Sequence, residues 1–275
     1  MNRPTFDSYR WHSEIFKCES TDISHFFSLL EEEKNRLGLI VQKLGDVGGE
    51  PIWLMQSPAQ NSANPNLLIS AGFHGEEAAG PWGMLNFLSN LNPSLFEKVN
   101  LSLLPLINPT GFANGHRFNV LGENPNRGFY IKDGIAQAGE HTSVEGKILI
   151  DHSNILLSAS RDGILTCHED VLLTDTYVYT FEPTQVPGKF SYNLRDALGQ
   201  YFPIVKDGNI DDCPVRNGVI FNHFDSSFES FLVQQGARIG CCSETPGQQN
   251  LDQRILANAA VMTTFVKMAQ VSSDA

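Results

Sequence analysis

Short apolar runs alternate with longer helix-like stretches along most of this chain. Four runs have the length and composition of buried strands, at residues 66–72, 99–108, 163–168 and 237–244. Helices are expected at residues 20–38, 77–91, 151–160, 191–202 and 249–270, and a hairpin at residues 37–57. Strands that alternate with helices predict an α/β fold, in which a mixed, largely parallel sheet lies between helices.

The whole chain, residues 1–275, is expected to form a single domain, with the helix and hairpin of residues 1–60 packed against the rest. No repeat, low-complexity tract or linker divides the 275-residue sequence, and this length suits one α/β domain. Residues 109–146 are rich in Asn, Gly and Pro, so we predict that they form loops.

Charge and apolar content argue against two kinds of partner, and cysteine content indicates a compartment. The formal net charge is -12, which argues against nucleic acid, because phosphate binding needs clustered Lys and Arg. No segment is long and apolar enough to span a bilayer, so no membrane partner is expected. The start lacks the apolar core of a signal peptide, and the five cysteines include no CxxC motif. We therefore expect a cytoplasmic protein, with Cys167, Cys241 and Cys242 as small buried side chains.

Residues that can bind a metal follow three of the predicted strands. The stretch "AGFHGEEAAG" places His74 at a strand end and Glu77 three residues later, His168 ends a second strand, and Glu244 ends a third. In open α/β sheets, ligands bind at the carboxyl ends of strands. Two His and one Glu with an open fourth position form a catalytic zinc set. Alone, the HxxE pattern is weak, and a surface histidine with a carboxylate at a helix N-terminus explains it better than a metal site.

The third metal ligand could be one of four histidines: His116, His152, His168 and His223. We favour His168, because an apolar strand delivers it, as another strand delivers His74. Glu169 or Asp170 could orient a ligand from behind, but a solvated loop acid is the simpler expectation for each.

Taken in order, these residues resemble the zinc carboxypeptidase family, the carboxypeptidase A-like metallopeptidases. The stretch "NPTGFANGHRFNVLGENPNRGF", residues 108–129, adds an NPxG motif, an arginine and an Asn-Arg pair. The matching positions are His74, Glu77, Asn108, Pro109, Gly111, Arg117, Asn126, Arg127, His168 and Glu244. The resemblance covers roughly residues 67–244 and implies a carboxypeptidase-like (phosphorylase/hydrolase-like) fold.

The resemblance also implies a role for each matching side chain. His74, Glu77 and His168 would bind one Zn²⁺ ion, although another divalent metal could occupy such a site. Glu244 would act as the general base toward water. Arg117 would donate hydrogen bonds to the oxyanion. Arg127, with Asn126, would clamp a free carboxylate of the substrate.

Three positions depart from the family pattern or leave it open. Asn124 stands where the family usually has an aspartate, but its amide oxygen can still accept from the imidazole of His74. No tyrosine follows Tyr201, so His223 is the candidate for the hydrogen bond that a tyrosine gives to substrate in the family, although an ordinary loop histidine is the simpler expectation. Glu229 falls in "SSFESFLV", which we interpret as a helix with this acid in solvent; a buried acid there would favour a basic terminal residue.

These observations predict a zinc-dependent metallocarboxypeptidase that hydrolyses an amide or peptide bond next to a free carboxylate. Its partner would be a peptide or acyl-amino acid substrate. An N-acyl amino acid deacylase of the aspartoacylase type would share the same residues, and a non-catalytic metal- or peptide-binding protein is a further alternative. Serine hydrolysis is disfavoured, because no GxSxG motif occurs.

Overall fold

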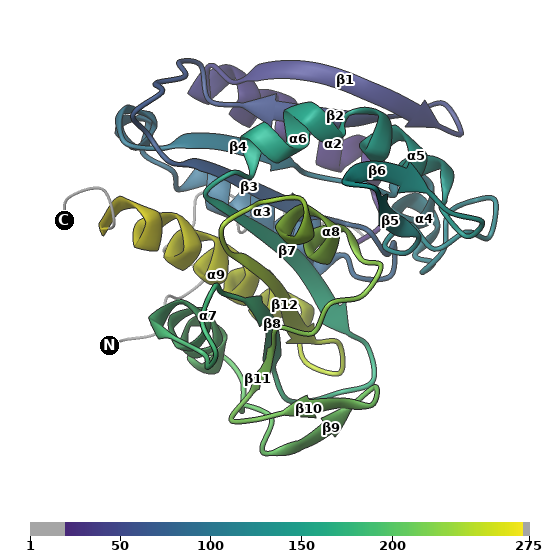
Figure 1. Ribbon diagram of the computed structural model, residues 1–275. Helices are drawn as coiled ribbons and strands as arrows, with labels where there is room; N and C mark the ends of the chain where they lie inside the picture. Colours follow the sequence, from purple (N-terminus) through teal and green to yellow (C-terminus); the bar gives the residue numbers. More distant parts are fainter. Residues whose placement is uncertain (1–19, 272–275) are drawn as a thin grey trace.

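The computed structural model describes residues 20–271, which are built around one eight-stranded sheet (Figure 1). Its strands follow one another across the sheet in the order β1-β2-β4-β3-β7-β12-β8-β11. Their bounds are Ile40–Val47 (β1), Glu50–Gln56 (β2), Asn66–Ala71 (β3), Asn100–Leu104 (β4), Gly163–Asp170 (β7), Tyr177–Phe181 (β8), Val219–Phe221 (β11) and Gly240–Pro246 (β12).

The sheet is mixed, with a parallel centre. β3 pairs in parallel with β4 and β7, and β7 pairs in parallel with β12. β8 runs antiparallel to β12 but parallel to β11, and the hairpin of β1 and β2 joins the opposite edge through an antiparallel contact with β4. The predicted hairpin is therefore part of the main sheet. This arrangement confirms the predicted mixed, mostly parallel sheet.

Helices cover both faces of the sheet (Figure 1). One face carries the helices α2 (Ile23–Leu37), α3 (Ala79–Ser89), α7 (Lys189–Gly199) and α9 (Leu251–Val271). The other carries α5 (Val144–Asp151), α6 (Ser153–Ala159) and α8 (Phe228–Gln234). Phe26 and Trp82 are fully buried in the first layer, and Phe73 and Phe228 in the second, so the sheet is buried on both sides.

The segment 109–146, predicted as loops, contains regular structure. It holds α4 (Pro109–Asn114), the hairpin of β5 (Phe129–Lys132) and β6 (Ile135–Ala138), and the start of α5. The α4 helix has an identifiable sequence signal, because Asn108 caps it and Pro109 occupies its first turn. The loop prediction was therefore wrong for these elements.

The small remaining elements lie at the margins of the sheet. They are the 3-10 helix η2 (Pro93–Glu97) and the hairpin of β9 (Gly208–Ile210) and β10 (Cys213–Val215). Of the N-terminal unit predicted at residues 1–60, residues 1–19 lie outside the described part of the chain. Within residues 20–271, no helix combines the length and the apolar character needed to cross a bilayer.

Candidate metal centre

Three neighbouring strands bring the predicted site residues to one end of the sheet. β3 lies beside β7, with Ala71 opposite Cys167, and β7 lies beside β12, with His168 opposite Glu244. All three strands run in the same direction, so their carboxyl ends meet at one edge. The chain leaving β3 therefore carries His74 to the place where His168 and Glu244 end their own strands.

The turn after β3 is shaped by contact between two glycines. A side chain on Gly75 would place its Cβ 1.9 Å from the carbonyl carbon of Gly111, so the turn and α4 pack backbone to backbone. Asn108 fastens the same turn: its Oδ1 accepts from Gly111 N at 2.8 Å, and its Nδ2 donates to Phe73 O at 3.2 Å. A second, longer bond joins Asn108 Nδ2 to Arg117 O at 3.3 Å. The NPTG motif thus holds the segments that carry His74 and Arg117.

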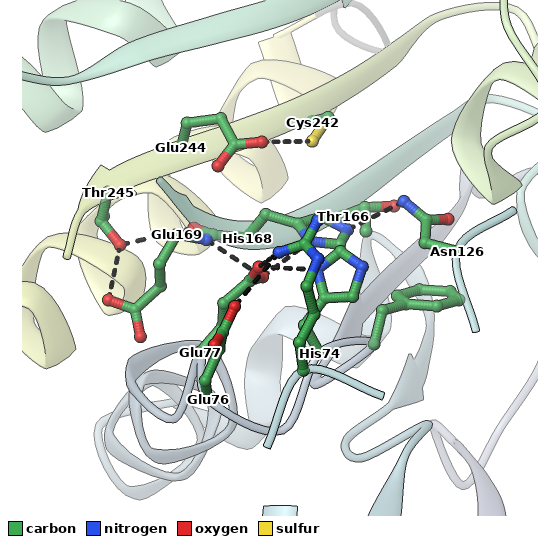
Figure 2. Close-up of polar contacts among 12 residues, drawn as sticks. His74, Glu76, Glu77, Asn126, Thr166, His168, Glu169, Cys242, Glu244 and Thr245 are labelled. Atoms are coloured by element: carbon green, nitrogen blue, oxygen red, sulfur yellow. Dashed lines mark hydrogen bonds and ion pairs between the residues drawn. The ribbon is translucent and has the colours of Figure 1, made fainter. Parts of the chain in front are cut away.

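His74, Glu77 and His168 converge on one point (Figure 2). Nδ1 of His74 lies 2.6 Å from one oxygen of Glu77, and Nδ1 of His168 lies 2.8 Å from the other. Their candidate ligand atoms all lie within 4.8 Å of one another, and all three residues are buried. Two imidazole nitrogens and a carboxylate are the donor set of a catalytic zinc site, so these residues fit one divalent cation.

The charges of the three residues are strongly coupled. Burial alone would raise the pKa of Glu77, but the positive charges and hydrogen bonds of His74 and His168 hold it well below its ordinary value. Burial lowers the pKa of His168, but the charge and hydrogen bond of Glu77 outweigh burial and raise this pKa to about 9. This polar cluster is stable only when positive charge, from protons or a metal, faces Glu77.

Both imidazole rings are held from outside by asparagines. Nε2 of His74 lies 3.1 Å from Oδ1 of Asn124, the contact expected from the sequence. Nε2 of His168 lies 3.1 Å from the amide nitrogen of Asn126, whose oxygen accepts from Phe228 N at 2.9 Å. An amide oxygen, as in the contact between Asn124 and His74, accepts from the outer N–H of a ligating imidazole and fixes its orientation. The amide of Asn126, which the resemblance assigns to the clamp for a substrate carboxylate, is hydrogen-bonded within the protein in this structure, and that role stays a prediction.

Glu169 is a buried structural acid and does not face solvent, contrary to the expectation for it. Its carboxylate accepts from Ala79 N at 2.8 Å and forms an ion pair with Arg254. Thr245 donates to the same carboxylate at 3.3 Å, as Figure 2 shows. Because Glu169 N also donates to Glu77 at 3.2 Å, this residue ties α3 and α9 to a metal ligand.

Glu244 lies on β12, apart from the three converging residues, and faces the same cavity (Figure 2). The Cys242 thiol donates to its Oε1 at 3.6 Å. Removal from water raises the pKa of Glu244 to about 8, although the positive charge of His168 opposes this shift. A carboxylate with an elevated pKa is suited to accept a proton near neutral pH.

Two arginines border the cavity. Arg117 Nη1 lies 3.3 Å from Glu76 and 3.2 Å from Glu77, and its side chain is 37% exposed. Arg127 Nη1 donates to Asn126 O at 2.7 Å and lies 3.8 Å from Asp225, and its side chain is 46% exposed. Each guanidinium therefore has one side anchored and another side open to a ligand.

The cavity has a volume of about 440 Å³ and is lined by all eight residues predicted for the site. His223 is an exposed part of its wall and lies near the ring of Tyr179. Tyr177 and Tyr179 from β8 also line the cavity, and sequence reasoning missed them. The signal was present in "TYVYTF", because residues 177, 179 and 181 project from the same face of a strand. The Tyr177 hydroxyl donates to Asp170 at 3.0 Å.

Other residues are placed differently from their sequence interpretation. Glu229 was expected in solvent, but it is 5% exposed and lines the cavity, because α8 turns this side toward the sheet. His116, His152 and His223, the other candidate ligands, do not belong to the metal-binding group. Nδ1 of His152 instead lies 2.9 Å from Ile148 O. The cysteines at positions 167, 241 and 242 are free and buried, as predicted.

A family model and several solved structures match this chain. A family model for the succinylglutamate desuccinylase/aspartoacylase catalytic domain matches residues 63–144. No curated protein matches the chain. A solved structure from Shewanella amazonensis, described as a candidate metallopeptidase, is 70% identical over 93% of this chain and 96% of that one, with a TM-score of 0.92.

Two further solved structures extend this comparison. A candidate metallopeptidase from Shewanella denitrificans is 60% identical over 98% of this chain and 99% of that one, with a TM-score of 0.87. Carboxypeptidase A from Helicoverpa armigera is 13% identical over 100% of this chain and 78% of that one, with a TM-score of 0.66. At that identity the last match shows a shared fold alone.

Proposed function

Since this chain belongs to the carboxypeptidase A-like metallopeptidase family, which includes the succinylglutamate desuccinylase/aspartoacylase branch, we propose that it is a zinc-dependent carboxypeptidase-type hydrolase. It would cleave an amide or peptide bond next to a free carboxylate. The observation that carries this proposal is that Glu244, the two arginines and the group of His74, Glu77 and His168 all line one cavity.

The arrangement divides the chemistry among separate groups. A divalent metal held by His74, Glu77 and His168 would supply Lewis acidity and make water more acidic. Glu244, on the neighbouring strand, holds a carboxylate that accepts a proton from the attacking water and delivers it to the leaving amine.

The two arginines have complementary tasks in this proposal. Arg117, beside Glu77, donates hydrogen bonds to the negative charge that develops on the scissile carbonyl. Arg127 binds the free carboxylate, because a guanidinium meets a carboxylate in two parallel hydrogen bonds. Only a substrate with such a carboxylate would be held with its scissile bond beside the metal centre.

A deacylase acting on N-acyl amino acids is the second candidate. It is favoured by the desuccinylase/aspartoacylase model that matches residues 63–144. Both reactions cleave an amide beside a carboxylate, so the same residues serve either. Activity on a panel of blocked dipeptides, compared with a panel of N-acyl amino acids, would separate them.

The substitution Glu244→Gln tests the proposed reaction. It removes the base and leaves the metal ligands in place, so kcat/KM should fall by roughly 10²- to 10⁴-fold. Metal content, measured by mass spectrometry, should stay at the wild-type level. The surface substitution Glu97→Gln makes the same chemical change on an exposed side chain and should leave both quantities unchanged.

Full hydrolysis by a metal-loaded Glu244→Gln protein would contradict the assignment of the base. If the metal-loaded wild-type protein hydrolyses neither panel, the non-catalytic binding alternative is favoured instead.

A further inference from the structure

Glu169 holds the metal ligand Glu77 in two ways. The backbone N–H of Glu169 donates to Oε2 of Glu77 at 3.2 Å, and this is the oxygen that faces Nδ1 of His168. The carboxylate of Glu169 accepts from the backbone N–H of Ala79, the first residue of α3, at 2.8 Å. Glu169 therefore contacts Glu77 directly and also fixes the residue two positions after it.

The Glu169 carboxylate is itself held by a closed ring of polar contacts at the start of α9. Its Oε2 atom forms an ion pair with Arg254 and accepts from the Thr245 hydroxyl at 3.3 Å. The Asn258 amide closes the ring, because its Nδ2 donates to Thr245 Oγ1 at 3.2 Å and to Arg254 O at 3.0 Å. Glu169, Thr245 and Asn258 are at most 2% exposed, so this ring lies inside the protein.

Arg254 supplies the positive charge of the ring. It lies in the first turn of α9, its side chain is 15% exposed, and its Nε donates to Gln249 O at 3.1 Å. The guanidinium is thus fixed from two sides. A buried carboxylate that loses its cation is costly, so removal of Arg254 would favour movement of Glu169 out of its present place.

A displacement of Glu169 would reach more than one metal ligand. The Thr245 hydroxyl also lies 3.4 Å from His168 O, and His168 is the neighbour of Glu169 in β7. The start of α3 has little room to adjust, because a Cβ on Gly80 would already lie 3.1 Å from Cys167 O. The ring at α9 is therefore joined to the backbone that carries His168 and to the carboxylate of Glu77.

We propose that Arg254 is a positioning residue for the metal centre: its ion pair with Glu169 keeps Glu77 and His168 in the orientation that binds the cation. The start of α9 and the metal centre are then coupled, so each stabilises the other. Groups that contact metal ligands from behind typically change metal affinity by 10- to 100-fold. Arg254 acts through one further residue, so a change of roughly tenfold is expected. This inference concerns metal binding and holds whichever bond the protein cleaves.

The zinc affinity of the Arg254→Met protein tests the proposal without any substrate. Methionine keeps part of the apolar stem and removes the charge, so the dissociation constant, measured by competition with a chromophoric chelator, should rise by roughly tenfold. Arg254→Lys keeps the charge and should recover part of this loss. Lys267→Met removes a charge from an exposed side chain of the same helix and should bind zinc like the wild type.

A double variant covers the case in which Arg254→Met does not fold. Glu169→Gln/Arg254→Met replaces the buried charge pair by neutral groups, and the glutamine oxygen can still accept from Ala79 N. Because the anchoring ion pair is absent, this protein should also bind zinc roughly tenfold more weakly than the wild type. Wild-type zinc affinity in either folded variant would overturn the proposal.

Two further measurements separate positioning from a general loss of stability. The visible absorption of the cobalt-loaded protein reports the geometry of the ligands, and its bands should shift in Arg254→Met and stay unchanged in Lys267→Met. Zinc should slow hydrogen exchange at residues 254–258 by roughly tenfold in the wild type, and by much less in Arg254→Met. A lower denaturation midpoint with an unchanged cobalt spectrum and unchanged zinc affinity would show that Arg254 serves stability alone.

Discussion

At the scale of single residues, Glu77 is the centre of the site. Its two oxygens face Nδ1 of His74 and Nδ1 of His168, and one of them also accepts from Glu169 N. Arg117 lies 3.2 Å away on the cavity side. One carboxylate thus joins four groups from three segments, and the charge that faces it decides which protons or metals the site holds.

Metal binding should therefore depend on pH. The negative charge of Glu77 raises the pKa of His168 to about 9 against the opposing effect of burial, so below that pH the metal-free ring carries a proton that a metal must displace. The apparent Zn²⁺ affinity should rise with pH, by about tenfold per pH unit between pH 6 and pH 8 for one displaced proton.

Zinc calorimetry in buffers with different ionisation enthalpies counts the protons released. Release of at least one proton per zinc at pH 7 is expected. An affinity that stays constant from pH 6 to pH 8, with no proton released, would contradict this description of His168.

The sequence predicted the positions of some site residues better than those of others, for a physical reason. His74, His168 and Glu244 follow apolar strands, and parallel strands must end together, so their convergence could be predicted. Glu169 and Glu229 could not be placed, because the sequence does not show which side of a strand end or short helix is covered. The catalytic and substrate-binding roles of these side chains stay predictions.

At the scale of elements, the site depends on contact between the turn after β3 and the start of α4. The carbonyl of Gly111 occupies the space where any side chain on Gly75 would lie. The long, strongly apolar elements were predicted with small errors at their ends. Several short ones, among them α4, α5, β5, β6, β8 and β11, were missed because they are held by caps and tertiary contacts that leave a weak pattern.

The substitution Gly75→Ala should disturb the metal centre without touching a ligand. Its Cβ would lie 1.9 Å from the Gly111 backbone, so the turn must move and carry His74 with it. We expect Zn²⁺ affinity to fall by more than about tenfold and stability to fall by about 1–3 kcal/mol, as for other overpacked positions.

Gly208→Ala is the matched control, because a Cβ there meets no atom within 4 Å. It should change neither zinc affinity nor the denaturation midpoint. Wild-type zinc affinity in the Gly75→Ala protein would show that the turn does not position His74.

At the scale of the whole molecule, one mixed sheet carries every part of the site. Its central strands deliver the metal-binding residues and Glu244, the loop after α4 carries Arg117 and Arg127, and α8 contributes Glu229 (Figure 1). The alternation of strands and helices predicted this architecture. The strand order and the cavity follow from packing between segments far apart in the chain, which a single sequence does not specify.

The account depends most directly on His74, Glu77 and His168 binding one divalent cation together. Anomalous diffraction at the zinc absorption edge, from crystals of zinc-loaded protein, tests this claim. We predict one strong anomalous peak within bonding distance of both Nδ1 atoms and the Glu77 carboxylate, and no peak there in the Glu77→Ala variant. A zinc-saturated crystal with no peak among these three side chains would contradict the account.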